Sequence, residues 1–182
     1  MVYILLGEGF EEAEALVTAD VLRRADIPVT LTGIGRDTVT GSHNITVRTD
    51  KPVNLVKLQP DDMVVLPGGM GGVAAMEGSG EAMALIRQAA AGGDYWLAAI
   101  CAAPTLLGRW GHLSGKEAVC YPGMEGQLAG AQARPDVACG VVTDGRIITG
   151  RAAGSAFDFG LALVEALKGK GAAEQVRNAI RY

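Results

Sequence analysis

The segment around Cys101 constrains the fold most, because an apolar run passes there into a helical pattern with almost no connection. Residues Trp96 to Ile100 are typical of a buried strand and end directly at Cys101, and residues 102–107 are typical of a helix. Such a tight connection needs small residues on both sides, since the two backbones approach closely, and Ala99 and Ala103 meet that need. The pattern predicts a nucleophile elbow that presents Cys101 at the carboxyl edge of a sheet.

This position predicts a reactive thiol. A helix that starts at Ala102 points its positive end and its unpaired N–H groups at the sulfur of Cys101, and both favour the thiolate. The local pattern leaves a second interpretation open, in which Cys101 is a small buried apolar residue, as free cysteines usually are.

Short aliphatic runs alternate with longer helical stretches along the rest of the chain, and no low-complexity segment divides them. This order is typical of an α/β fold with a mostly parallel sheet, helices on both faces and ligands at the carboxyl ends of the strands. We therefore expect one domain over residues 1–182. The patterns predict strands near 2–6, 28–34, 62–66 and 117–121, a strand and turn over 96–101, a hairpin of 137–143 and 146–149 turned by Asp144-Gly145, and helices over 11–25, 80–92, 102–109, 154–168 and 172–179.

Composition excludes several classes of partner and location. Charged residues make up 20% of the chain, the net charge is −4 and the pI is about 5.2, so no basic patch indicates nucleic acid or an anionic membrane as a partner. The apolar start at residues 2–6 is too short for a signal peptide or a membrane span. Three cysteines without CxxC spacing indicate neither a disulfide framework nor a zinc site. We expect a soluble protein of the cytoplasm.

A glycine-rich turn follows the predicted strand at 62–66. Its sequence, Pro67-Gly68-Gly69-Met70-Gly71-Gly72, can bring backbone N–H groups close to a reacting oxygen, as half of an oxyanion hole. The N–H of Ala102, directly after the nucleophile, would be the other half. Phosphate binding is not indicated, because the spacing is not GxGxxG and no Lys-Ser/Thr follows. An ordinary loop remains the alternative.

An acidic cluster follows the first strand, where Glu8, Glu11, Glu12 and Glu14 stand close together. Most of it is explained by the positive end of a helix. Glu14 differs, because apolar residues three and seven positions later share its helix face and place it inward. A carboxyl buried there would take up a proton and could donate a hydrogen bond to a thiolate, lowering the thiol's pKa while its own rises. A solvated acidic cluster is the alternative, and a metal site lacks histidines at ligand spacing.

Four segments of the chain resemble, in order, the motifs of the ThiJ/PfpI family. Within it the chain is most similar to the branch of the Parkinson-linked protein deglycase and chaperone and of the bacterial YajL protein. The resemblance covers nearly the whole chain, and its segments are Gly9–Glu14, Val64–Gly69, Ala98–Pro104 and Phe157–Leu163.

The resemblance implies a fold, an assembly and a site. The implied fold is a flavodoxin-like three-layer sandwich, related to class I glutamine amidotransferase domains, and the family usually forms homodimers. Cys101 would be the reactive, easily oxidised cysteine and Glu14 the acid that hydrogen-bonds it. Gly69 and Ala102 take the positions of the backbone donors.

The chain also departs from the family at several positions. Family peptidases carry a histidine directly after the cysteine, where this chain has Ala102, so a cysteine peptidase would lack its base. Close relatives often carry a histidine at the position of Tyr121, whose hydroxyl could instead bind a carbonyl substrate. His43 stands where relatives have an arginine that reaches the partner subunit's site, and a plain surface histidine is equally open. Cys120 is close enough in sequence to the site loop to be a candidate resolving cysteine.

Two functional classes follow from the resemblance. The first is a cofactor-independent glyoxalase or protein deglycase, in which Cys101 adds to methylglyoxal-type dicarbonyls or acts on their adducts on proteins, and Glu14 moves the protons. The second is a redox-sensing chaperone whose Cys101 is oxidised to a sulfinic acid stabilised by Glu14. Neither needs a metal or another cofactor. The expected partners are a small reactive carbonyl or a glycated protein, and a second copy of the chain.

Overall fold

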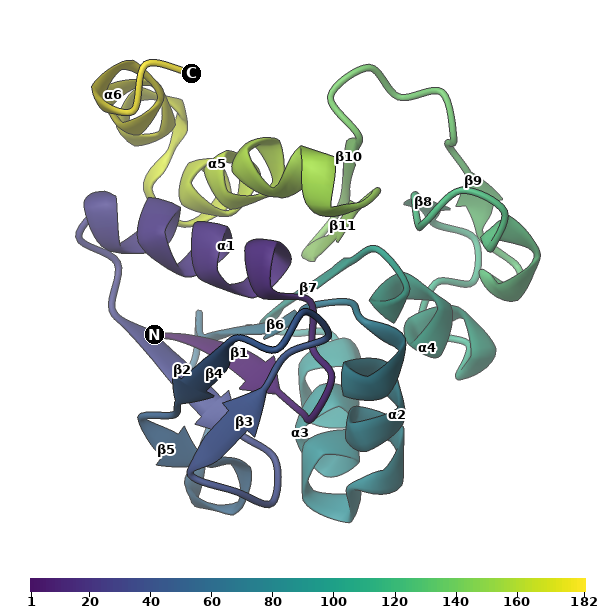
Figure 1. The fold of residues 1–182 in the computed structure, drawn as a ribbon. Helices are drawn as coiled ribbons and strands as arrows, with labels where there is room; N and C mark the ends of the chain where they lie inside the picture. Colours follow the sequence, from purple (N-terminus) through teal and green to yellow (C-terminus); the bar gives the residue numbers. More distant parts are fainter.

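The computed structural model describes residues 1–182 and is built on a seven-stranded sheet (Figure 1). All neighbouring strands are parallel except the hairpin of β10 and β11. The strand order is β10-β11-β7-β6-β1-β2-β5. These strands are β1 (Val2–Leu6), β2 (Val29–Gly33), β5 (Lys51–Pro52), β6 (Met63–Leu66), β7 (Trp96–Ile100), β10 (Val141–Asp144) and β11 (Ile147–Gly150).

Helices cover both faces of the sheet, which confirms the predicted α/β sandwich (Figure 1). The helices α1 (Glu12–Arg24), α5 (Ala156–Lys168) and α6 (Lys170–Ala179) cover one face, and α2 (Met70–Gly78), α3 (Gly80–Ala90) and α4 (Ala103–Arg109) cover the other. Short 3₁₀ turns lie at Val53–Leu55, Glu125–Gln127 and Ala153–Ser155. No helix combines the length and the apolar character that crossing a bilayer requires.

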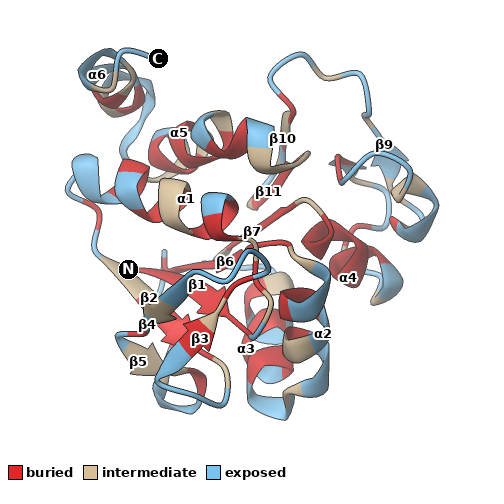
Figure 2. Ribbon diagram, viewed as in Figure 1, coloured by how far each residue is buried: buried red, intermediate tan, exposed pale blue.

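The central strands are buried on both faces, so their side chains divide between two cores (Figure 2). In β7, Leu97 and Ala99 pack toward α2, α3 and α4, while Ala98 and Ile100 pack toward α1, α5 and α6. This alternation follows from the two-residue period of a strand. Each fully buried large apolar side chain contributes roughly 1.5–3 kcal/mol, which fixes the register of the strands that carry the site.

Three local predictions were wrong. The predicted strand at 117–121 shrinks to β8 (Glu117–Ala118), which pairs with β9 (Gln132–Ala133) outside the main sheet. The turn of the β10–β11 hairpin is Gly145-Arg146 rather than Asp144-Gly145, because Asp144 pairs with Ile147. The glycine-rich segment is not a loop throughout, since α2 begins at Met70.

The sequence prediction also missed a small hairpin of β3 (Thr38–Thr40) and β4 (Thr46–Arg48). Its strands have three residues each and are largely exposed, so the sequence shows too few alternations to identify them. This hairpin lies over the segment between β1 and α1 (Figure 1). It therefore bears directly on the candidate site.

Candidate active site

The predicted site residues follow three strands that lie side by side. In the sheet β7 is next to β6 and β6 is next to β1. Cys101 follows β7, Gly68 and Gly69 follow β6, and Glu14 lies in the first turn of α1 after β1. Because parallel strands end at the same edge, residues far apart in sequence meet there.

Cys101 lies on the predicted elbow. Its φ is +66°, a left-handed conformation that is uncommon for a residue with a side chain. The backbone holds it there, because its N–H donates to the Gly150 carbonyl at 2.9 Å and its own carbonyl accepts from the N–H of Tyr121 at 2.8 Å. Such a conformation stores strain and is found mostly at functional sites. The thiol itself is half-buried.

Gly68 and Gly69 allow the loop after β6 to lie against this elbow. A Cβ on Gly68 would lie 2.6 Å from the Cβ of Cys101 and 2.6 Å from Oε2 of Glu14, closer than carbon atoms can approach. Gly69 has a φ of +81° and precedes α2. Burial raises the pKa of Cys101, and the N–H groups of Gly69 and Ala102, which lie near its sulfur, act in the opposite direction. The structure thus places both predicted backbone donors at the nucleophile.

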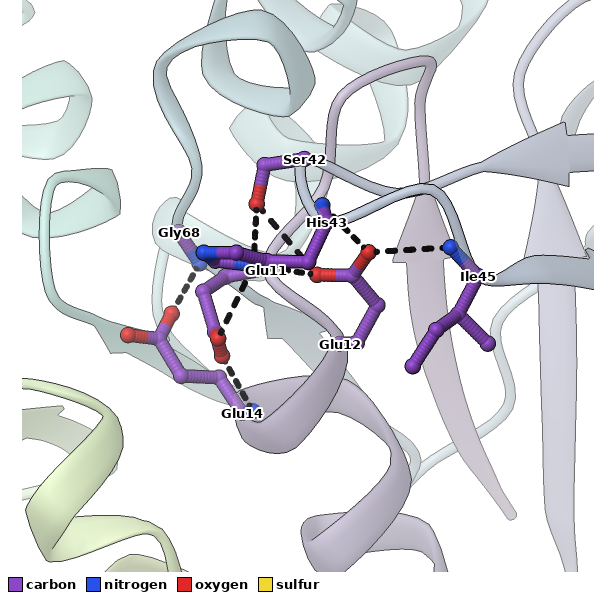
Figure 3. A network of polar contacts seen from close by, with 7 residues as sticks. All are labelled: Glu11, Glu12, Glu14, Ser42, His43, Ile45 and Gly68. Carbon is purple, nitrogen blue, oxygen red and sulfur yellow. Dashed lines mark hydrogen bonds and ion pairs between the residues drawn. The ribbon is translucent and has the colours of Figure 1, made fainter.

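Glu14 is buried beside this thiol, with only 1% of its surface exposed. Its Oε2 accepts a hydrogen bond from the N–H of Gly68 at 2.7 Å (Figure 3). Its Oε1 is buried without a partner of full hydrogen-bond geometry, and the thiol of Cys101 interacts with the same carboxyl. The inward orientation predicted from the helix period is therefore confirmed.

The predicted lowering of the thiol's pKa is wrong, whereas the predicted rise for Glu14 is confirmed. Burial raises the pKa of Glu14 to about 7, against the opposing hydrogen bonds from Cys101 and Gly68. Burial, and then the Glu14 carboxylate, raise the pKa of Cys101 to about 12, although the N–H groups of Ala102 and Gly69 oppose this. The two groups titrate as a pair. Losing both protons is unfavourable, so the pair holds one proton over a wide range of pH, and a thiolate requires a protonated Glu14.

Glu11 and Glu12 are not a solvated cluster. Glu11 caps α1 by accepting from the N–H of Glu14 at 2.7 Å, and Glu12 is buried. Glu12 accepts from the N–H of His43 at 2.6 Å and lies 2.9 Å from its Nδ1, with Ser42 and Ile45 as further donors (Figure 3). Burial would raise the pKa of Glu12, but hydrogen bonds that include those from His43 and Ile45 lower it to about 2, and Glu12 in turn raises the pKa of His43.

His43 is thus close to carboxylates that are far from it in sequence, which the spacing argument against a metal site did not foresee. Ligand atoms of Glu11, Glu12 and His43 lie within 4.8 Å of one another. Both oxygens of Glu12 are already used by the turn between β3 and β4. The ring of His43 is 70% exposed, and its Nδ1 contacts Glu12 of the same chain.

A hollow of about 330 Å³ opens beside Cys101. Tyr121 lines it and is 49% exposed. Cys120 instead packs into the core on the opposite side of the sheet from the cluster that Cys101 contacts, and burial raises its pKa to about 11. These two properties make it a poor resolving thiol. The hollow is lined by Glu11, Gly69, Met70, Cys101, Ala102, Tyr121, Pro122, Gly123 and Met124.

Comparison with known proteins decides the family. The model of the DJ-1/PfpI family matches residues 1–166. The chain belongs to the DJ-1/PfpI family. It is 40% identical over 178 residues to protein dj-1beta of Drosophila melanogaster, covering 97% of this chain and 94% of that protein. It is 31% identical over 166 residues to the glutathione-independent glyoxalase DJR-1.2 of Caenorhabditis elegans, covering 91% of this chain and 87% of that protein.

The structural comparison gives the same family. A crystal structure of a cysteine-to-alanine mutant of the DJ-1 superfamily protein STM1931 from Salmonella typhimurium has a TM-score of 0.91 and 32% sequence identity. It covers 100% of this chain and 97% of that one. The flavodoxin-like fold expected of a DJ-1/PfpI member is therefore the fold of this chain.

Proposed function

We propose that the protein is a stress-protection enzyme that converts 2-oxoaldehydes of the methylglyoxal type, or their early adducts on proteins, without a cofactor. The observation that carries the proposal is the pairing of Cys101 with the buried carboxyl of Glu14 at the elbow. One group supplies a nucleophile and the other moves protons within reach of it. Similarity to a glutathione-independent glyoxalase supports the same reaction.

The first step is addition to the aldehyde. The Cys101 thiolate forms a C–S bond to the aldehyde carbon, and the carbonyl electron pair moves to oxygen, which takes the proton from Glu14. The product is a hemithioacetal beside an ionised Glu14. The N–H groups of Gly69 and Ala102, which face the sulfur, are positioned to stabilise charge on the neighbouring oxygen.

The second step is an internal redox reaction. Glu14 takes the proton from the former aldehyde carbon and passes it to the adjacent carbonyl oxygen, giving an enediol. Glu14 then takes the proton of the hydroxyl group on the first carbon, the former aldehyde carbon, and delivers a proton to the second carbon, the former ketone carbon. The first carbon is oxidised to a thioester and the second is reduced to an alcohol. Water cleaves the thioester, which releases a 2-hydroxy acid and restores the pair.

The test is turnover of methylglyoxal by the purified protein without glutathione, with formation of lactate as the readout. The Cys101→Ser protein is the blank, because serine is close to cysteine in size and lacks the thiol nucleophile. We expect lactate at a rate proportional to enzyme and none from the blank. Equal rates from both proteins would refute the proposal. A cysteine peptidase is disfavoured, since no histidine lines the hollow beside Cys101.

A second candidate is a redox-sensing chaperone. The specific observation behind it is the carboxyl of Glu14, which interacts with the thiol of Cys101 and whose Oε1 is buried with no hydrogen-bond partner. A protonated carboxyl there can donate a hydrogen bond to a sulfinate on Cys101. Suppression of client aggregation that depends on the oxidation state of Cys101, without lactate formation, would favour this function over the enzyme.

We also propose that the protein is a homodimer, as in the family it belongs to. His43 and Ile45 on the turn between β3 and β4 are exposed, at 70% and 51%, and the family places this turn toward the partner's site. Light scattering at micromolar concentration is expected to give twice the chain mass of 18.8 kDa. A monomer at that concentration would contradict the proposed assembly.

A further inference from the structure

The hollow beside Cys101 has apolar walls. Met70, the first residue of α2, is 68% exposed, and Tyr121 on the opposite loop is 49% exposed. Pro122 and Met124 continue this wall. The N–H of Tyr121 donates to the carbonyl of Cys101 at 2.8 Å, so the wall is held against the elbow. Large apolar side chains that remain in contact with water beside a nucleophile indicate a surface for an apolar ligand.

The hollow is also too large for the smallest dicarbonyls. Its volume of about 330 Å³ lies near the lower end of the range of about 300–1,000 Å³ that holds drug-sized ligands. Methylglyoxal has a single methyl group beyond its two carbonyls and leaves most of this space to water. A ring or a branched chain in that place would bury the faces of Met70, Tyr121 and Met124.

The charge of the lining restricts the ligand further. Among the residues of the same chain, Glu11 is the only charged side chain in the hollow, and no lysine, arginine or histidine lines it. Glu11 lies beside the pair of Glu14 and Cys101, and its charge helps to raise the pKa of Glu14. A substrate with a carboxylate or phosphate would meet the like charge of Glu11 here, and the same chain offers no cation to offset it.

We propose that this hollow receives the substituent of a neutral 2-oxoaldehyde, and that the chain prefers aryl or bulky alkyl 2-oxoaldehydes to methylglyoxal and to anionic analogues. The inference rests on the proposed function and names its substrate class. The aldehyde carbon meets the sulfur of Cys101, and the substituent lies between Met70 and Met124. One methylene in an apolar pocket changes kcat/KM by about 10- to 200-fold. A whole ring is therefore expected to raise kcat/KM by about tenfold or more.

The experiment measures kcat/KM for phenylglyoxal, methylglyoxal and 4-carboxyphenylglyoxal from initial rates, because arylglyoxals also modify arginine slowly. We expect phenylglyoxal to exceed each of the others by about tenfold or more. The Met70→Ala/Met124→Ala protein should lower the ratio of phenylglyoxal to methylglyoxal by about tenfold. Leu55→Ala removes an apolar side chain outside the hollow that is 60% exposed, against 68% for Met70, and should leave the ratio unchanged.

The outcomes separate the inference from the proposed function. Turnover of methylglyoxal with no preference for phenylglyoxal, or a preference that survives the double substitution, overturns the inference and leaves the function standing. Equal use of 4-carboxyphenylglyoxal and phenylglyoxal overturns its charge component. The Glu11→Gln protein should narrow that gap while keeping the cap of α1, since a glutamine oxygen can still accept from the N–H of Glu14. No turnover of any aldehyde refutes the function and the inference together.

Discussion

The carboxylate of Glu12 accepts a hydrogen bond from the N–H of His43 at 2.6 Å and lies 2.9 Å from its Nδ1, although 31 residues separate the two in sequence. Two backbone hydrogen bonds run beside this contact, from Gly9 to Thr40 and from Ser42 to Phe10. Together these contacts hold the turn between β3 and β4 against the start of α1. Glu12 lies two residues, about half a helical turn, before Glu14. The position of Glu14 therefore depends on the β3–β4 hairpin, although no residue of this hairpin lines the hollow beside Cys101 of the same chain.

The first prediction concerns the pH dependence of this contact. Glu12 has a lowered pKa of about 2, so its contribution to stability is present above the ordinary value of 4.5 and is lost as pH falls toward 2. His43 has a raised pKa, so its contribution is complete below 6.5 and is lost as pH rises through the raised value. The pair stabilises most between these limits. His43→Ala should therefore lower the urea midpoint more at pH 5.5 than at pH 9.

A matched control for this test is His112→Ala. His112 has a lowered pKa, chiefly through burial, so its contribution should have the opposite dependence and grow with rising pH. Equal losses for His43→Ala at both pH values would mean that the ring acts only through packing.

The second prediction concerns Gly68. A Cβ there would overlap Cys101 and Glu14, so Gly68→Ala must push the loop after β6 away from the elbow. We expect a loss of about 1–3 kcal/mol in the free energy of unfolding, and slower alkylation of Cys101 because the donor N–H of Gly69 moves with the loop. Gly78→Ala is the control, since nothing lies within 4 Å of the added atom, and it should be neutral or slightly stabilising. Equal behaviour of the two variants would contradict this account of the loop.

The sequence predicts the elbow and the inward face of Glu14 because both depend on short, local patterns. The run from Trp96 to Ile100 has only one compatible environment, a strand buried on both faces, and the helical period alone turns Glu14 inward. The contact of Glu12 with His43 could not be predicted this way, because it depends on a hairpin whose strands are too short to have a period. The direction of the shift in the pKa of Cys101 is predicted wrongly, because no local pattern shows that burial of the thiol outweighs the effect of the two N–H groups.

The third prediction tests whether Cys101 and Glu14 share one proton. If the pair loses its first proton near pH 7 and its second near pH 12, the fraction of thiolate is constant between these values, and the rate of alkylation by iodoacetamide should be nearly flat with pH. In Glu14→Gln the thiol titrates alone, so the rate should rise about tenfold per pH unit up to its pKa. That pKa should lie below about 12, because the neighbouring negative charge is gone.

The measurement follows alkylation by intact mass from pH 7.5 to 10 in a Cys139→Ser background, since Cys139 is the exposed cysteine and Cys120 is buried. The background removes the reaction that would hide a flat profile. A tenfold rise per pH unit in the protein that keeps Glu14 would show that the two groups do not share a proton.

The last prediction concerns oxidation. Two equivalents of peroxide transfer two oxygens to Cys101 and give a sulfinate, which is more stable when a protonated carboxyl donates a hydrogen bond to it. Such a bond to a charged group contributes about 1.5–3 kcal/mol, and the carboxyl of Glu14, which interacts with the thiol of Cys101 and has an unpartnered Oε1, can make it. Glu14→Leu should therefore accumulate less of the species that carries two added oxygens, and more of the sulfenic and sulfonic forms.

Intact mass after mild peroxide treatment measures these products. Glu8→Leu, which changes an exposed glutamate of the same cluster, is the control that should leave the distribution unchanged. Identical yields of the sulfinic form with and without Glu14 would remove this residue from the oxidation chemistry, while leaving its role in aldehyde turnover to be decided by lactate formation.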